Sequence, residues 1–345
     1  MKDKHSRFKI AIGHKIQAGP YGGGNAFVRV LTDTLVRSGH QVFFELEQGD
    51  LDFIVMTDPR SRSPNVTFAA GSILDYLKKN PRTLVIHRIN ECDERKGTKT
   101  MNPRLRLANY CADHTVFVGS WLKNLNLVFR REQKSNSVIL NGVDTEIFHP
   151  RGYLSWEGSG PLKLVTHHWG GNWMKGFDVY EKLDAMLASP EWRNIIEFTY
   201  IGNLPPGFLF RHATYMKPIS GQALACALRA NHVYVTGSIN EPGGNHQIEG
   251  GACGLPLLYR NSGCMPEYCD GFGLMFEGDD IEPSLRSMLN QYSNYQPRMI
   301  HFPHAAQRTS QNWLSLFDLL DQQRERLLAL RQSSLFHEIA NRIPW

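Results

Sequence analysis

Mainly apolar runs alternate with amphipathic stretches through the first 150 residues. The apolar runs predict strands buried on both faces, at 8–13, 41–46, 52–56, 83–89, 114–119 and 137–141. The stretches between them have apolar residues at helical spacing, at 25–38, 71–79, 103–111 and 120–129. In 25–38, for example, the predicted apolar face comprises Val28, Leu31, Leu35 and Val36. Strands that alternate with helices predict a parallel, doubly wound α/β sheet.

The same pattern restarts after a Gly- and Pro-containing hinge at 150–161. Strands are predicted at 162–167, 196–201, 232–236, 255–259 and 274–276, with helices at 177–187, 222–230 and 281–291. From 304 to about 331 the chain is predicted to be helical. The apolar side of these last helices comprises Trp313, Leu314, Phe317, Leu319 and Leu320. We therefore expect two Rossmann-like domains, at 1–150 and 151–303, and a terminal helical segment at 304–345.

Composition narrows the class of protein. The 345 residues are 41% hydrophobic, which is enough for two buried cores. The six cysteines are scattered without a C-x-x-C pair, so reduced thiols are expected and not a disulfide framework or a zinc site. No apolar run approaches a membrane span, and no signal-peptide core precedes the first strand. A cytoplasmic protein is therefore expected.

Charge is distributed unevenly along the chain. Residues 1–150 contain 22 Lys and Arg against 15 Asp and Glu, whereas residues 151–345 contain 16 against 18. A basic first half indicates an acidic partner, such as an acidic or lipid-linked acceptor or peripheral contact with an anionic inner membrane face. An ordinary solvated surface explains the same charge equally well. Nucleic acid is not expected, because no basic-aromatic stripe is present.

The segment E-P-G-G-N-H-Q-I-E at 241–249 carries the most specific chemistry. If a helix begins near Gly244, Asn245 and Glu249 lie one turn apart on the same face. Glu241 then lies in the strand-to-helix loop, and Gly243 and Gly244 form the helix start. Free backbone amides suit a diphosphate, and carboxylates suit sugar hydroxyls. The segment therefore predicts a nucleotide-sugar site.

Together with A-C-G-L-P at 252–256, this segment resembles the signature of retaining GT-B glycosyltransferases of family 4. N-G-V-D at 141–144 and K-G-F-D at 175–178 resemble two further markers of that family. The resemblance implies two Rossmann-like domains facing across a cleft, with the last helix crossing back to the first domain. It implies transfer of a hexose from a nucleotide-diphospho-sugar to an acceptor hydroxyl, with retention, front-face attack and no metal.

The resemblance also implies roles for residues of the second domain. Glu249 would accept hydrogen bonds from the ribose, and Glu241 with the amides of 243–245 would hold the hexose and diphosphate. Lys175 would stabilise the departing phosphate. The family usually has an Arg five residues before this Lys, but position 170 is Gly. Three substitutes for that Arg remain open, namely Asn172, His168 or a nest of backbone amides.

Candidates in the first half follow two predicted strands. The Gly-rich loop at 19–24, in particular Gly23 and Gly24, would touch donor phosphate in the resembled family. His87 is the nearest match to a family histidine near the reacting sugar, although a core histidine is the alternative. The polar residues beside it that we expect to contact the acceptor are Arg88, Asn90, Asp93, Arg95 and Lys96.

Two other functions stay open at this point. One is a phosphorylase or sugar-nucleotide epimerase on the same fold, and the other is a catalytically silent sugar-nucleotide-binding protein. The pair Asp279 and Asp280 precedes a predicted helix, where the helix dipole already favours acids, so we expect no metal there.

Overall fold

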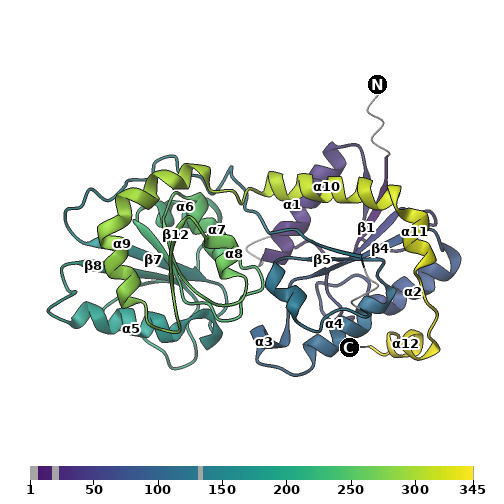
Figure 1. Cartoon of the computed structure of the whole chain (residues 1–345), viewed down its shortest axis with the longest axis horizontal. Coiled ribbons are helices and arrows are strands. Elements are labelled where there is room, and N and C mark those ends of the chain that lie inside the picture. Colours follow the sequence, from purple (N-terminus) through teal and green to yellow (C-terminus); the bar gives the residue numbers. More distant parts are fainter. Residues whose placement is uncertain (1–6, 18–22, 131–134, 345) are drawn as a thin grey trace. The chain divides into compact units, whose positions relative to one another are not determined.

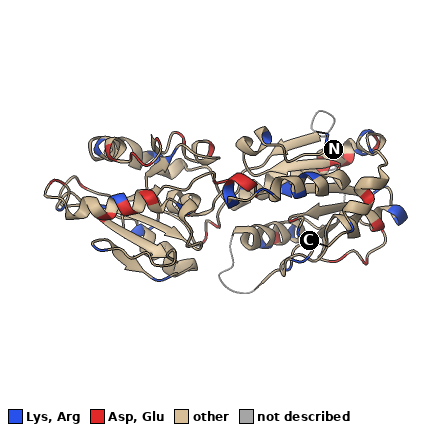
Figure 2. Ribbon diagram, turned by 90° about the horizontal axis from the view of Figure 1, so that it is seen from below, with Lys and Arg blue, Asp and Glu red and all other residues tan. Residues whose placement is uncertain are grey.

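The computed structural model describes residues 7–17, 23–130 and 135–344 (Figure 1). The chain divides into two compact units. The first unit comprises residues 1–140 and 307–345, and the second comprises residues 141–306. Each contains a parallel sheet of six strands with helices packed against it. In the view of Figure 2, charged residues lie mostly on helices and loops.

The sheet of the first unit has the order β2-β1-β3-β4-β5-β6. Its strands are β1 (Lys9–Ile12), β2 (Gln41–Phe43), β3 (Phe53–Met56), β4 (Leu84–Ile89), β5 (His114–Phe117) and β6 (Ser135–Val138). Its helices before the crossover are α1 (Gly23–Arg37), α2 (Ala70–Lys79), α3 (Asp93–Lys96) and α4 (Met101–Ala108). Alternate strand residues enter two cores, with Ile10 and Ile12 facing α1 and Ala11 facing the α2 side. Apolar residues on both faces explain why the strands have nearly continuous apolar sequences.

The last helices belong to the first unit. They are α10 (Ala306–Gln322), α11 (Arg324–Ala329) and α12 (Leu335–Ala340). Trp313, Phe317 and Leu320 of α10 pack into the core that α1 also covers. The prediction for Leu319 is wrong, because it is exposed while Leu316 is buried. The chain thus returns to the first unit, as expected.

The sheet of the second unit has the order β12-β11-β10-β7-β8-β9. Its strands are β7 (Leu162–His168), β8 (Ile196–Gly202), β9 (Thr214–Met216), β10 (Val233–Thr236), β11 (Leu257–Arg260) and β12 (Gly273–Phe276). Its main helices are α5 (Phe177–Ala188), α6 (Gly221–Arg229), α7 (His246–Ala252), α8 (Met265–Cys269) and α9 (Glu282–Tyr295). Residues 141–150 lie with this unit, where Val143 forms a parallel bridge with Ala305.

One predicted helix is largely absent. Over 120–129 the structure has only a 3-10 turn, Ser120–Asn124, followed by irregular chain. Both Leu122 and Leu127 are fully buried, and a spacing of five does not place two side chains on one face of a helix. Burial of both leucines therefore favours the irregular path.

Candidate functional site

The strand order of the second unit changes direction between two neighbouring strands, β7 and β10. From β7 the chain continues outward through β8 and β9, then returns to β10 on the other side of β7. Such a switch in strand order is where open α/β sheets bind ligands, at the carboxyl ends of the strands. The loops that follow β7, β10 and β11 all begin at this edge.

Two glycines bring the first two of these loops together. A Cβ atom at Gly176 would lie 2.5 Å from the Cα of Gly237, and Gly176 has φ of +96°. The amide of Ile239 also donates to the carbonyl of Met174 at 2.9 Å. Only glycine permits this approach of backbone to backbone. The Gly of K-G-F-D thus fixes the loop that carries Lys175 against the loop that leads to Glu241.

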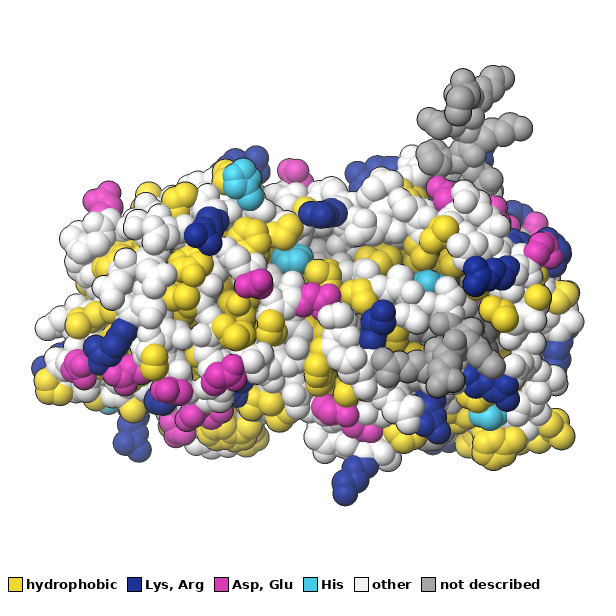
Figure 3. All heavy atoms as spheres, viewed as in Figure 1, with side chains coloured by type: hydrophobic (Ala, Val, Ile, Leu, Met, Phe, Trp, Pro, Cys, Tyr) yellow, Lys and Arg dark blue, Asp and Glu magenta, His cyan; other side chains and the backbone are white. Residues whose placement is uncertain are grey.

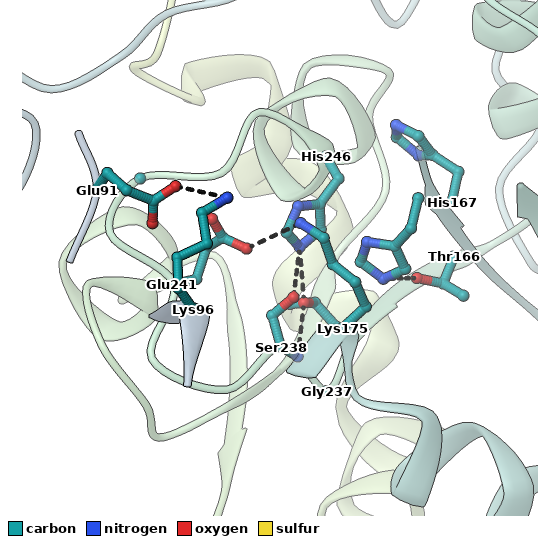
Figure 4. Close-up of polar contacts among 12 residues, drawn as sticks. Glu91, Lys96, Thr166, His167, Lys175, Gly237, Ser238, Glu241 and His246 are labelled. Carbon is teal, nitrogen blue, oxygen red and sulfur yellow. Dashed lines mark hydrogen bonds and ion pairs between the residues drawn. The ribbon is translucent and has the colours of Figure 1, made fainter. Parts of the chain in front are cut away.

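Lys175 and Glu241 form an ion pair at the resulting junction. The Lys175 Nζ lies 3.3 Å from Oε2 of Glu241, and the two side chains are 20% and 8% exposed. Figure 4 shows the two pointing toward each other beside His246. A Cβ atom at Gly170 would lie 3.2 Å from Cε of Lys175 and 3.4 Å from the amide nitrogen of Asn172. Because Gly170 has no side chain, the aliphatic part of Lys175 packs beside it. The exposed Asn172 lies next to the same position.

The backbone of Glu241 is held from the β11 side. Asn240 has φ of +50°, a region that Asn tolerates better than most residues. Its amide donates to the Ser262 hydroxyl at 2.8 Å. The Cys264 amide donates to the Glu241 carbonyl at 2.8 Å, and Gly263 packs on the same peptide. The carboxylate of Glu241 therefore projects from a fixed main chain.

The segment after Glu241 differs slightly from expectation. The helix α7 begins at His246 with Asn245 as its N-cap, so the predicted start near Gly244 is wrong by two residues. A Cβ atom at Gly244 would lie 2.7 Å from the His246 ring, which explains the glycine. The side chain of Asn141, from N-G-V-D, donates to the Gly243 carbonyl at 2.6 Å. The sequence motif gave no sign of this contact.

Glu249 is one turn past Asn245, as predicted, and its amide donates to the Asn245 carbonyl at 2.8 Å. Its Oε2 lies 2.7 Å from Nε2 of His167, at the end of β7. The Nδ1 atom of His167 lies 3.2 Å from the Tyr234 hydroxyl. Burial raises the pKa of Tyr234 well above its ordinary value, so the phenol keeps its proton.

The neighbouring His168 lies in a different network. Its Nε2 atom is 2.7 Å from the Tyr180 hydroxyl, and its ring is 4.5 Å from that of His246. The Nε2 atom of His246 contacts Thr236 Oγ1 at 2.9 Å. His168 is thus held in a buried network, and its role as a substitute for the missing Arg stays a prediction. Sequence reasoning missed this cluster, although the adjacent pair in strand β7 was a signal that the two rings face opposite sides.

Two candidates of the first unit are buried in strand β4. His87 is fully buried, and its Nδ1 lies 3.2 Å from the Asn109 amide nitrogen. The guanidinium carbon of Arg88 lies 3.9 Å from the centroid of the Phe27 ring, and Arg88 is also buried. These contacts fit the core alternative for His87. Its catalytic role stays a prediction.

The remaining acceptor candidates follow β4. Asn90 is half-buried. Asp93 accepts from Thr98 and from the amides of residues 101 and 102. Burial raises the pKa of Asp93, but these hydrogen bonds outweigh it and hold that pKa below its ordinary value. Asp93 therefore ties the loop together within the first unit.

Of the two basic acceptor candidates after β4, only Lys96 is exposed. Arg95 is buried, and Lys96 pairs with Glu91 at 2.8 Å. On the face seen in Figure 3, positive and negative side chains are interspersed over both units. Within 90–99 the sequence has three basic residues, at 95, 96 and 99, against three acidic residues, at 91, 93 and 94, so the surplus of positive charge in the first half does not come from this segment.

The Gly-rich loop is described only in part. Residues 18–22 lie outside the described residues, and Gly23 and Gly24 form the first turn of α1. A Cβ atom at Gly24 would meet no atom within 4 Å. The side chain of Asn25 exchanges two hydrogen bonds with the backbone of Gln17, which holds the preceding chain.

The described residues, 7–17, 23–130 and 135–344, contain no group of three or more His, Cys, Asp or Glu arranged to hold a metal ion. None of their helices combines the length and the apolarity that crossing a membrane requires.

No protein-family model matches the sequence, and no curated protein matches it. Solved structures do resemble it. A glycosyltransferase from Rickettsia africae has a TM-score of 0.66 at 14% identity, covering 92% of this chain and 100% of that chain. The catalytic domain of starch synthase IV from Arabidopsis thaliana, bound to ADP and acarbose, has a TM-score of 0.63 at 12% identity, covering 94% and 100%.

The Anabaena protein HepE in complex with UDP-glucose has a TM-score of 0.56 at 12% identity, again covering 94% and 100%. Likeness at these identities shows the fold alone. The chain has the GT-B fold, with two Rossmann-like domains, and this confirms the predicted fold class.

Proposed function

We propose that this protein is a retaining glycosyltransferase of the family 4 type, which moves a hexose from a nucleotide-diphospho-sugar to an acceptor hydroxyl. One observation carries the proposal. Lys175 of K-G-F-D and Glu241 of E-x7-E form an ion pair at the carboxyl ends of β7 and β10. The GT-B fold, shared with proteins solved with UDP-glucose or ADP, supports it.

Each group has a task that its chemistry suits. Lys175 neutralises the leaving diphosphate as a point charge, exchanging its Glu241 partner for phosphate oxygens. Glu241 then accepts from hexose hydroxyls, and the amides of 243–245 hold the diphosphate. Glu249 accepts from the ribose. The leaving phosphate assists deprotonation of the acceptor on the same face, so neither a second carboxylate at glycosidase spacing nor a metal is required.

A thermal-shift screen with UDP-, GDP- and ADP-sugars tests the donor class, because a ligand that binds the folded state raises the melting temperature. The donor that stabilises most is then used for transfer with EDTA present, and the anomeric configuration of the product is read by NMR. Retention supports the proposal. Inversion overturns the mechanism, and binding without any transfer favours the silent binding protein. A requirement for inorganic phosphate, or turnover without acceptor, favours the phosphorylase or epimerase.

Glu249→Ala tests the ribose contact. We expect nucleotide affinity to fall at least about tenfold, because a hydrogen bond to a charged group contributes roughly 1.5–3 kcal/mol. Glu197→Ala is the matched control, since Glu197 is exposed on β8. Calorimetry gives the affinities. Equal affinities for wild type and Glu249→Ala would remove Glu249 from this role.

A further inference from the structure

A chain of three side chains ends at the carboxylate assigned to the ribose. Tyr234 on β10 contacts Nδ1 of His167 on β7, at 3.2 Å, and Nε2 of His167 contacts Oε2 of Glu249 on α7, at 2.7 Å. The side chains of His167 and Glu249 are 11% and 19% exposed. The chain thus crosses from the strands to α7, and exposure increases from the fully buried Tyr234 to Glu249.

The positions of the protons follow from what each group can donate. An ionised carboxylate only accepts, so the hydrogen of the short contact belongs to Nε2 of His167. In a neutral ring Nδ1 is then an acceptor. The Tyr234 hydroxyl accepts from the His167 amide at 3.2 Å. Its own proton is within reach of two acceptors, Nδ1 of His167 at 3.2 Å and the His167 carbonyl at 3.3 Å. When Nδ1 takes that proton as acceptor, Tyr234 favours the tautomer that donates to Glu249.

The second carboxylate oxygen, Oε1 of Glu249, forms no hydrogen bond with the described residues. A carboxylate with one oxygen held by a donor has a fixed plane. Its other oxygen then offers an acceptor in a set direction, which suits a hydroxyl donor of a ligand.

We propose that His167 is a positioning residue for nucleotide recognition, which holds Oε2 of Glu249 so that Oε1 is presented to the ribose hydroxyls. The inference rests on the proposed function, because it needs a nucleotide bound at the carboxyl ends of β7 and β10. It predicts that His167 contributes to the discrimination between ribose and deoxyribose and not only to stability.

The test compares one nucleoside diphosphate with its 2′-deoxy and 3′-deoxy analogues by calorimetry. We expect wild type to prefer the ribonucleotide by about tenfold or more over at least one analogue. His167→Met removes the donor, and we expect that preference to fall to within about threefold, with little change in affinity for that deoxy analogue. His167→Gln retains an N–H donor and should keep most of the preference.

Tyr234→Phe provides a second variant if His167→Met does not fold. Removing the phenol frees the other tautomer, so the preference should fall several-fold while the ring of residue 234 still packs. An unchanged preference in His167→Met, or in Tyr234→Phe where His167→Met does not fold, overturns the inference. So does a wild type that binds the nucleotide without any preference for ribose. A wild type that binds no nucleotide or nucleotide sugar instead overturns the proposed function.

Discussion

At the scale of single residues, the site depends on charges that the chain holds in place. Lys175 and Glu241 are 66 positions apart, and each comes from a loop whose backbone is fixed by close glycine packing. The pair is largely shielded from solvent, so its electrostatic effect is stronger than that of an exposed pair. A lysine held in this way needs little reorganisation when a diphosphate leaves.

Lys175→Ala should therefore lower transfer on the order of 10²–10³-fold, because one preorganised cation is lost. The unfolding free energy should change by only about 1–3 kcal/mol, since other contacts hold the Glu241 backbone. Lys182→Ala, on α5 and paired with Asp280, is the control and should leave transfer unchanged. Initial rates and denaturant unfolding check both. A rate loss below tenfold for Lys175→Ala would place the charge stabilisation elsewhere.

At the scale of elements, the β7–α5 loop and the β10–α7 loop are packed directly against each other. Gly176 and Gly237 approach so closely that a side chain at Gly176 would meet backbone atoms of Gly237 at 2.3–2.5 Å and force the loops apart. The backbone hydrogen bond from Ile239 to Met174 depends on that approach. Separation of the loops would move Lys175 away from Glu241.

Gly176→Ala tests this dependence against a matched control. Gly176 and Gly207 both have positive φ, of +96° and +77°, so alanine costs about 1–2 kcal/mol of backbone strain at either position. Only Gly176 also has backbone atoms in the way, whereas Gly207 has none within 4 Å. We expect Gly176→Ala to lose more stability and most nucleotide affinity, and Gly207→Ala to keep that affinity. Equal affinities in the two variants would contradict the role of the close approach.

At the scale of the whole molecule, the first unit is assembled from two distant parts of the chain. Residues 307–345 complete a core that residues 1–140 begin, through Trp313 and Phe317 of α10. The candidate donor residues after position 140 all belong to the second unit. A variant in the core of the first unit therefore tests whether nucleotide binding depends on the stability of that unit.

Trp313→Ala should destabilise the first unit by about 3–5 kcal/mol, because it removes a large, fully buried side chain. Leu319→Ala on the same helix is the control, with a change within about 0.5 kcal/mol, because Leu319 is 47% exposed. Unfolding curves measure stability, and calorimetry at low temperature measures nucleotide affinity. A large loss of affinity in folded Trp313→Ala would show that the donor site depends on the first unit.

The sequence by itself determined the alternation of strands and helices and the second-unit motifs, whereas the return of the last helix was only implied by the family resemblance. Parallel strands buried on both faces need apolar runs, and loops whose backbones approach closely need glycine. Both requirements can therefore be recognised in a short stretch of sequence. Only the tertiary structure decided which polar residues meet. His167 and His168 are adjacent on β7, yet one contacts Glu249 and the other Tyr180. The basic residues Arg88 and Arg95 were expected to contact the acceptor, but both are buried. Side-chain direction and burial depend on partners distant in the chain, and a sequence pattern does not contain those contacts.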